Sequence, residues 1–123
     1  MNEYTKQDIE AAIRAITSMI DKSDNAQEKF TSGTSQHTLQ KNRIKALYVI
    51  LSLVKNELSE NDIISYSKED LETAVAPIAS LISKSEKARE KLKQGAWQHT
   101  MLSDNLKALY IAYPLLTKAL HEG

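Results

Sequence analysis

The amino-acid sequence repeats itself after 62 residues. Residues 4–58 align with residues 66–120 without a gap, and 23 of the 55 aligned pairs are identical. The longest identical stretches are Gln-His-Thr at 36–38 and 98–100 and Lys-Ala-Leu-Tyr at 45–48 and 107–110. Repeated units of this size bury their apolar faces against each other. The sequence therefore predicts a single domain over residues 1–123, made of two similar units and a linker over residues 59–65.

Each unit has the pattern of two helices. A hydroxyl residue followed three positions later by an aspartate begins each unit, at Thr5 and at Ser67, and this spacing is typical of a helix N-terminus. Apolar residues then recur every three or four positions as far as residues 30 and 92. A glycine suited to a helix C-cap follows at positions 33 and 95, and a second apolar stripe comes after it. We therefore expect four helices and no strands.

The lengths of the connections restrict the topology. About three residues join the two helices of each unit, so each pair is expected to form an antiparallel hairpin. The linker between the units spans at most about 25 Å, which is shorter than a 22-residue helix of about 33 Å. We therefore expect an all-α, up-down-up-down four-helix bundle of two tandem αα-hairpins with pseudo-twofold symmetry, in which both turns lie at one end. Exchange of a hairpin between two chains is the alternative.

Composition excludes several classes of protein. Basic and acidic residues number 16 each and divide evenly between the two halves, so neither half has the basic excess that nucleic-acid phosphates select. Without cysteine there are no thiolate metal sites and no cysteine nucleophile. The longest apolar run, residues 108–116, is too short for a membrane span, and the N-terminus lacks a signal-peptide core. We expect a cytoplasmic protein, of bacterial type from its excess of lysine over arginine, that binds neither membrane nor nucleic acid.

A candidate ligand site follows from the expected topology. If both turns lie at one end of the bundle, they bring together Gln36, His37, Trp97, Gln98 and His99. Two helix N-termini with free backbone N–H groups attract an anion. These five residues are therefore predicted to bind a small anion or another small ligand. The alternative is that Gln-His-Thr is a capping and packing sequence.

Metal binding and catalysis have weaker support in the sequence. Glu28 and Glu90 precede the same two turns, and together with His37 and His99 they would supply four ligands to a metal ion. The Glu-x-x-His and His-Glu-x-x-His spacings of established metal sites are absent, so neither a metal nor another cofactor is expected. No acidic residue stands within a helical turn of either histidine to orient it as a base, so no catalytic residue is predicted and we expect no enzyme.

Two groups of aromatic residues lead to different expectations. Tyr48, Tyr110 and Tyr113 fall on the apolar stripes and are expected to pack in the core with the hydroxyl at its edge. Trp97 stands in the second turn, where the first has Ser35, and is expected to be exposed, as tryptophans at interfaces often are. The first hypothesis is therefore a protein-interaction module that binds a partner or itself, with inhibitor, adaptor and immunity-type roles suggested only by analogy of fold. The alternative is the anion or small-ligand binder.

Overall fold

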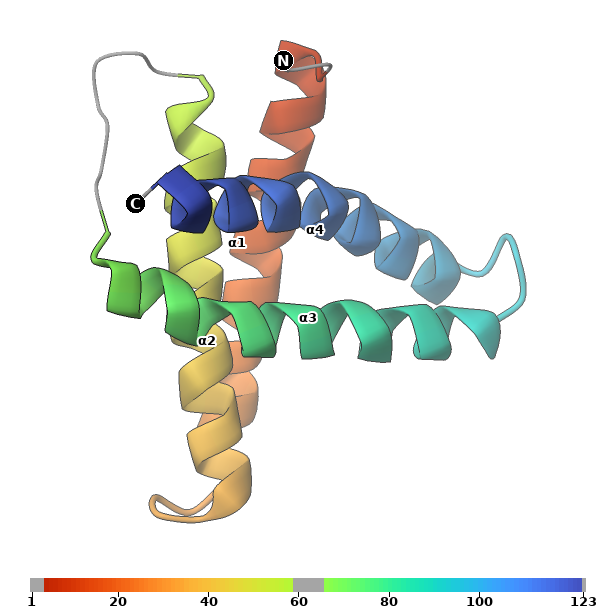
Figure 1. Ribbon diagram of the computed structural model, residues 1–123. Coiled ribbons are helices and arrows are strands. Elements are labelled where there is room, and N and C mark those ends of the chain that lie inside the picture. Colours follow the sequence, from red (N-terminus) through yellow and green to blue (C-terminus); the bar gives the residue numbers. More distant parts are fainter. Residues whose placement is uncertain (1–3, 59–65, 123) are drawn as a thin grey trace.

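Four helices account for all regular secondary structure in the part of the chain that the structure describes. The structure is a computed structural model, and it describes residues 4–58 and 66–122. The helices are α1 (Lys6–Glu28), α2 (Ser35–Asn56), α3 (Lys68–Glu90) and α4 (Trp97–Glu122). Helices α1 and α2 form one antiparallel hairpin, and α3 and α4 form another (Figure 1). The prediction of an all-α protein with four packed helices is confirmed. The linker expected over residues 59–65 lies outside the described residues.

Helices α1 and α3 and the turns that follow them have the same local structure. The hydroxyl of Thr5 accepts a hydrogen bond from the N–H of Asp8, and the hydroxyl of Ser67 accepts one from the N–H of Asp70. Helices α1 and α3 begin and end at residues 62 positions apart. Each turn contains a glycine at positive φ, 92° at position 33 and 91° at position 95, a conformation that glycine adopts without steric cost. The capping and turn signals in the sequence therefore mark the observed helix ends.

The two hairpins cross instead of lying along a common axis. Figure 1 shows α1 and α2 running vertically while α3 and α4 run horizontally in front of them. Helix α1 contacts α4, and α2 contacts both α3 and α4. The turn between α1 and α2 and the turn between α3 and α4 therefore project at separate extremities of the molecule (Figure 1). The expectation of an up-down-up-down bundle with both turns at one end is wrong.

Burial along α2 and α4 agrees with the crossing. Residues 35–45 of α2 and 97–105 of α4, which follow the turns, contain no buried side chain. The buried residues of these helices lie farther along, over 46–54 and 106–116. The later segments therefore pack at the crossing, where their apolar side chains are removed from water, and the segments that follow the turns project from it.

The core lies where the hairpins cross. Four alanines at matching positions, Ala12 and Ala74, Ala46 and Ala108, are at most 3% exposed. Small side chains at a contact allow helices to approach closely. Large apolar side chains with no exposed surface surround the crossing: Ile16, Leu47, Ile50, Val54, Ile78, Leu109 and Leu116. Both hairpins contribute to this cluster, so each completes the core of the other.

Candidate binding grooves

The first part of the predicted ligand site lies at the start of α2. Gln36 is exposed and His37 is half-buried. The N–H of His37 donates to the hydroxyl of Thr34 at 3.2 Å, and the N–H of Thr38 donates to the carbonyl of the same threonine at 3.1 Å. A threonine cap therefore already occupies part of this helix N-terminus.

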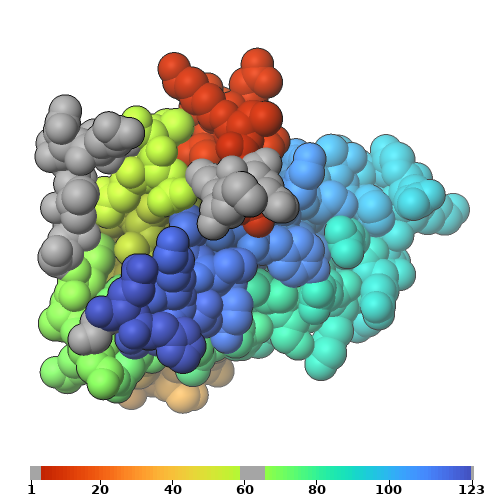
Figure 2. Space-filling view, turned by 45° about the horizontal axis from the view of Figure 1, so that its top comes forward, coloured from red at the N-terminus to blue at the C-terminus, as the bar shows by residue number. Residues whose placement is uncertain are grey.

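The second part of the predicted site lies at the start of α4. Trp97, the first residue of α4, is 70% exposed, as expected, while Gln98 and His99 are half-buried. Figure 2 shows the turn between α3 and α4 projecting from the body of the molecule, away from the end of the first hairpin. The structure therefore does not bring the Gln-His pairs of the two hairpins together.

The four residues considered as metal ligands are separated in the same way. Glu28 is the last residue of α1 and Glu90 is the last residue of α3, so each lies near the turn of its own hairpin. Within residues 4–58 and 66–122, no three histidine, aspartate or glutamate side chains lie close enough together to hold a metal ion.

Crossing of the hairpins creates two grooves that the sequence does not reveal. The α1/α4 groove lies between the first half of α1 and the first half of α4, and its volume is about 730 Å³. The α2/α3 groove lies between α2 and the first half of α3, and its volume is about 820 Å³. Both volumes fall within the range of about 300–1,000 Å³ that is usual for ligand sites. The residues that line each groove belong to the projecting arm of one hairpin and to a helix of the other, and Figure 1 shows how these helices cross.

The two grooves are lined by residues at matching positions of the two units. Thirteen residues of the α1/α4 lining stand 62 positions from thirteen residues of the α2/α3 lining. In seven of these pairs the residue is the same: Tyr4 and Tyr66, Asp8 and Asp70, Ala12 and Ala74, Ser18 and Ser80, Lys45 and Lys107, Ala46 and Ala108, Tyr48 and Tyr110. The two linings therefore come mostly from matching positions of the sequence.

Two tyrosines expected in the core lie in the grooves instead. Tyr48 is 50% exposed and Tyr110 is 43% exposed, and only Tyr113 is half-buried. Leu47 and Leu109, which precede the two exposed tyrosines, have no exposed surface. Successive residues of a helix are about 100° apart around its axis, so with the leucine directed into the core the next side chain reaches the flank. The prediction that Tyr48 and Tyr110 pack in the core is wrong.

The exposed tyrosines differ in their partners. The Tyr110 hydroxyl donates a hydrogen bond to the carboxylate of Glu86 on α3. This bond to Glu86 is the main cause that raises the pKa of Tyr110 above its ordinary value. The matching residues of the first hairpin are Tyr48 and Asp24, and no hydrogen bond joins them in the described part of the chain. Asp24 is one methylene shorter than Glu86.

Identical residues in the two units do not locate the grooves. Asp8 and Asp70, or Lys45 and Lys107, are identical polar pairs that line them. Identical polar pairs also occur outside both linings, as at Lys22 and Lys84 or Glu28 and Glu90. The location of the grooves could not be read from the sequence because it depends on how the hairpins cross.

A scan of protein-family models found no family that matches the chain, and searches of the curated proteins and of the solved structures found no similar protein. In the described residues, no helix combines the length and the apolar character that crossing a membrane requires. The function is therefore inferred from the grooves themselves.

Proposed function

We propose that the protein is a non-enzymatic protein-interaction module that holds a helical segment of a partner protein in a groove between its hairpins. The observation that carries this proposal is the presence of two grooves with matching linings, each with an exposed tyrosine in its wall. Tyrosine is enriched in the core of protein interfaces, where its ring is buried and its hydroxyl forms a hydrogen bond.

The shape of each groove supports a helical occupant. Each groove has two walls formed by crossing helices and a floor of small residues, Ala12 and Ala108 in one and Ala46 and Ala74 in the other. Amphipathic helices bind to proteins in grooves of this kind by laying their apolar side chains along the floor. An additional helix in either corner would pack against both hairpins.

The proposal includes a pseudo-twofold relation between the two units. The spacing of 62 residues holds for both ends of α1 and α3, the starts of α2 and α4, the positive-φ glycines and thirteen positions of the groove linings. Tandem duplication of one hairpin accounts for all of these. The duplication would then have produced two binding surfaces together with one shared core.

The anion-binding alternative has less support. It depended on Gln36 and His37 lying beside Gln98 and His99, and the two pairs lie at the ends of different hairpins. The N–H of His37 also donates its hydrogen bond to the Thr34 hydroxyl, so it is not available to an anion. Trp97 retains a place in the proposal because it lines the α1/α4 groove.

Selection of peptides from a display library of amphipathic helices, on the intact protein, tests the proposal. Selected peptides are expected to lose about tenfold or more in affinity when the tyrosine of their groove is removed by Tyr48→Ala or Tyr110→Ala. Lys84→Ala and Lys118→Ala, at exposed positions outside both linings, are the matched controls and should leave affinity unchanged. The proposal is overturned if no peptide can be selected. It is also overturned if the selected peptides bind the variant with both Tyr48→Ala and Tyr110→Ala as tightly as they bind the unaltered protein.

A further inference from the structure

The charges of the α1/α4 groove cancel. Its lining contains two aspartates, Asp8 and Asp104, and two basic residues, Arg14 and Lys107. A groove of this kind has no preference for the sign of a partner's charge.

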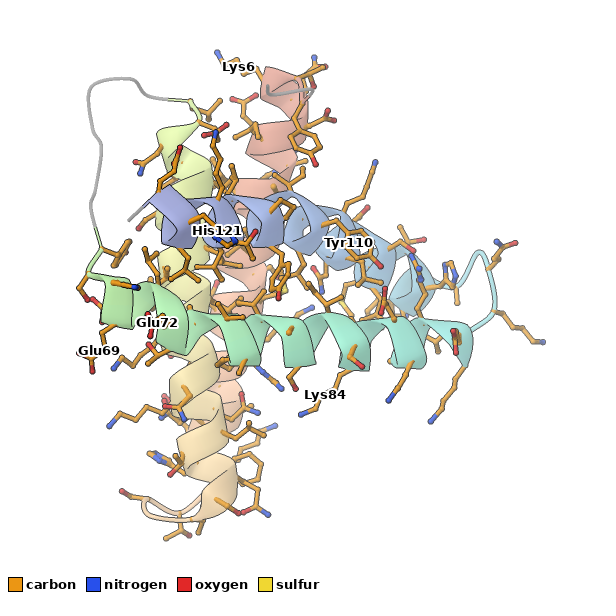
Figure 3. The ribbon with its side chains drawn as sticks, in the orientation of Figure 1. Lys6, Glu69, Glu72, Lys84, Tyr110 and His121 are labelled. Carbon is orange, nitrogen blue, oxygen red and sulfur yellow. The ribbon has the colours of Figure 1, made fainter. Side chains whose placement is uncertain are left out.

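The α2/α3 groove is acidic. Its lining contains Glu69, Asp70 and Glu72 against a single base, Lys45, which gives the lining a net charge of −2. Figure 3 shows Glu69 and Glu72 at the beginning of α3. Glu69 and Asp70 lie in the first turn of this helix, where the helix dipole stabilises negative charge.

The opposite wall of the α2/α3 groove has two exposed large apolar side chains. Leu39 is 44% exposed and Tyr48 is 50% exposed, and both belong to α2 together with Asn42 and Lys45 of the lining. The acidic groups belong to α3. An occupant of the groove would therefore meet apolar contacts on one wall and a cluster of acidic side chains on the other.

We propose that the α2/α3 groove binds a cationic amphipathic helix of a partner protein. The apolar face of that helix packs on Leu39 and Tyr48, and its lysine or arginine side chains lie against Glu69 and Glu72. Opposite charges across an interface increase the association rate and exclude partners of the wrong sign. This inference rests on the proposed function and narrows it to one groove and one class of partner.

Lys68 of this chain already lies beside Glu72 and would compete with the partner's cationic groups for that carboxylate. The Nζ atom of Lys68 lies 4.0 Å from a carboxylate oxygen of Glu72, with side chains 70% and 57% exposed. Exposed pairs of this kind contribute little to stability, so a cationic group of the partner can replace Lys68. The formal charge of the whole protein is zero, so attraction of a cationic helix must come from a local surface.

The test uses a helical peptide of about 15 residues made of leucine and lysine, and a second peptide with glutamate in place of lysine. Fluorescence anisotropy should show that the lysine peptide binds about tenfold or more tightly than the glutamate peptide, less so at high salt. Glu69→Lys with Glu72→Lys should weaken binding about tenfold or more, and Lys68→Ala should strengthen it by about twofold to threefold. Glu28→Lys with Glu90→Lys, the same charge change outside both linings, should have little effect.

Each contrary result has a separate meaning. If Glu28→Lys with Glu90→Lys weakens binding of the lysine peptide as much as Glu69→Lys with Glu72→Lys does, the inference is overturned. Binding would then depend on the overall charge of the protein and not on the α2/α3 groove. If Tyr110→Ala abolishes binding of the lysine peptide and Tyr48→Ala does not, the peptide lies in the α1/α4 groove. That result overturns the inference and leaves the proposed function standing. If neither this peptide nor any selected peptide binds in a groove, the proposed function fails as well.

Discussion

The two hairpins share buried leucines in the core and carry different charges in their grooves. Leu47 and Leu109 occupy matching positions, are identical and have no exposed surface. In the groove linings, by contrast, Arg14 matches Ala76 and Asp104 matches Asn42. Loss of a large core side chain costs several kcal/mol, whereas most surface substitutions change stability by less than about 0.5 kcal/mol. The leucines are therefore expected to determine stability, whereas the unmatched charges change the electrostatics of each groove and leave stability nearly unchanged.

The largest expected effect comes from the matched core leucines. Leu47→Ala and Leu109→Ala should each lower the free energy of unfolding by about 2–5 kcal/mol, because each leaves a cavity at the crossing of the hairpins. Urea denaturation followed by circular dichroism measures both. If the two units share one core, both variants should unfold in a single transition.

A second transition in either variant would break this comparison. It would show that one hairpin stays folded while the other unfolds. Glu10→Ala, a change on α1 outside the core cluster, serves as the control and should move the midpoint little.

Local features of the fold could be predicted from the sequence, and the arrangement of the hairpins could not. Thr5 and Ser67 mark the starts of α1 and α3, and the two glycines mark the turns, because capping and turn chemistry involve neighbouring residues only. The length of the linker excludes a parallel neighbour, but it sets no limit on the crossing angle. The crossing could not be read from the apolar pattern, because residues 35–45 and 97–105 bury no side chain although they include Leu39, Ile44 and Met101.

The prediction that the two Gln-His pairs lie together is wrong because it assumed that both hairpins lie along a common axis. His37 stands seven residues before Ile44 and thus continues the apolar stripe of α2 in sequence. In the structure the stripe is buried only from Ala46 onward, so His37 lies on the projecting arm. Tyr48 has a different cause, because it follows the buried Leu47 by about 100° around the axis of α2 and so lies on the flank of the helix. Exposure of Trp97 could be predicted because its place beside the turn did not depend on how the hairpins pack.

A smaller effect is expected at the starts of α2 and α4. Thr34 caps α2 through its hydroxyl, whereas the matching residue before α4 is Ala96, which has no side-chain acceptor. Thr34→Ala should lower the free energy of unfolding by about 1 kcal/mol, and Ala96→Thr should raise it by up to about 1 kcal/mol. Urea denaturation of both single variants and of the double variant measures these changes in the free energy of unfolding. No gain from Ala96→Thr would contradict the view that α4 lacks a cap.

The smallest expected effect concerns the tyrosines of the two grooves. The hydrogen bond from the Tyr110 hydroxyl to Glu86 raises the pKa of Tyr110 above its ordinary value of 10.0. The bond requires the protonated hydroxyl, so its contribution to stability is complete below pH 10.0 and is lost as pH rises through the higher pKa of the folded state. Since Tyr110 is 43% exposed, this contribution is small.

The titration of Tyr110 can be isolated by subtracting the phenolate absorbance of Tyr110→Phe from that of the unaltered protein. Glu86→Ala should move its midpoint down toward the ordinary value, because the variant lacks both the acceptor and the negative charge. Glu90→Ala, one helical turn away on α3, should leave the midpoint in place. An unchanged midpoint in Glu86→Ala would show that the bond does not form in solution. Tyr110 would then be as unconstrained as Tyr48, and the two tyrosines would no longer distinguish the grooves.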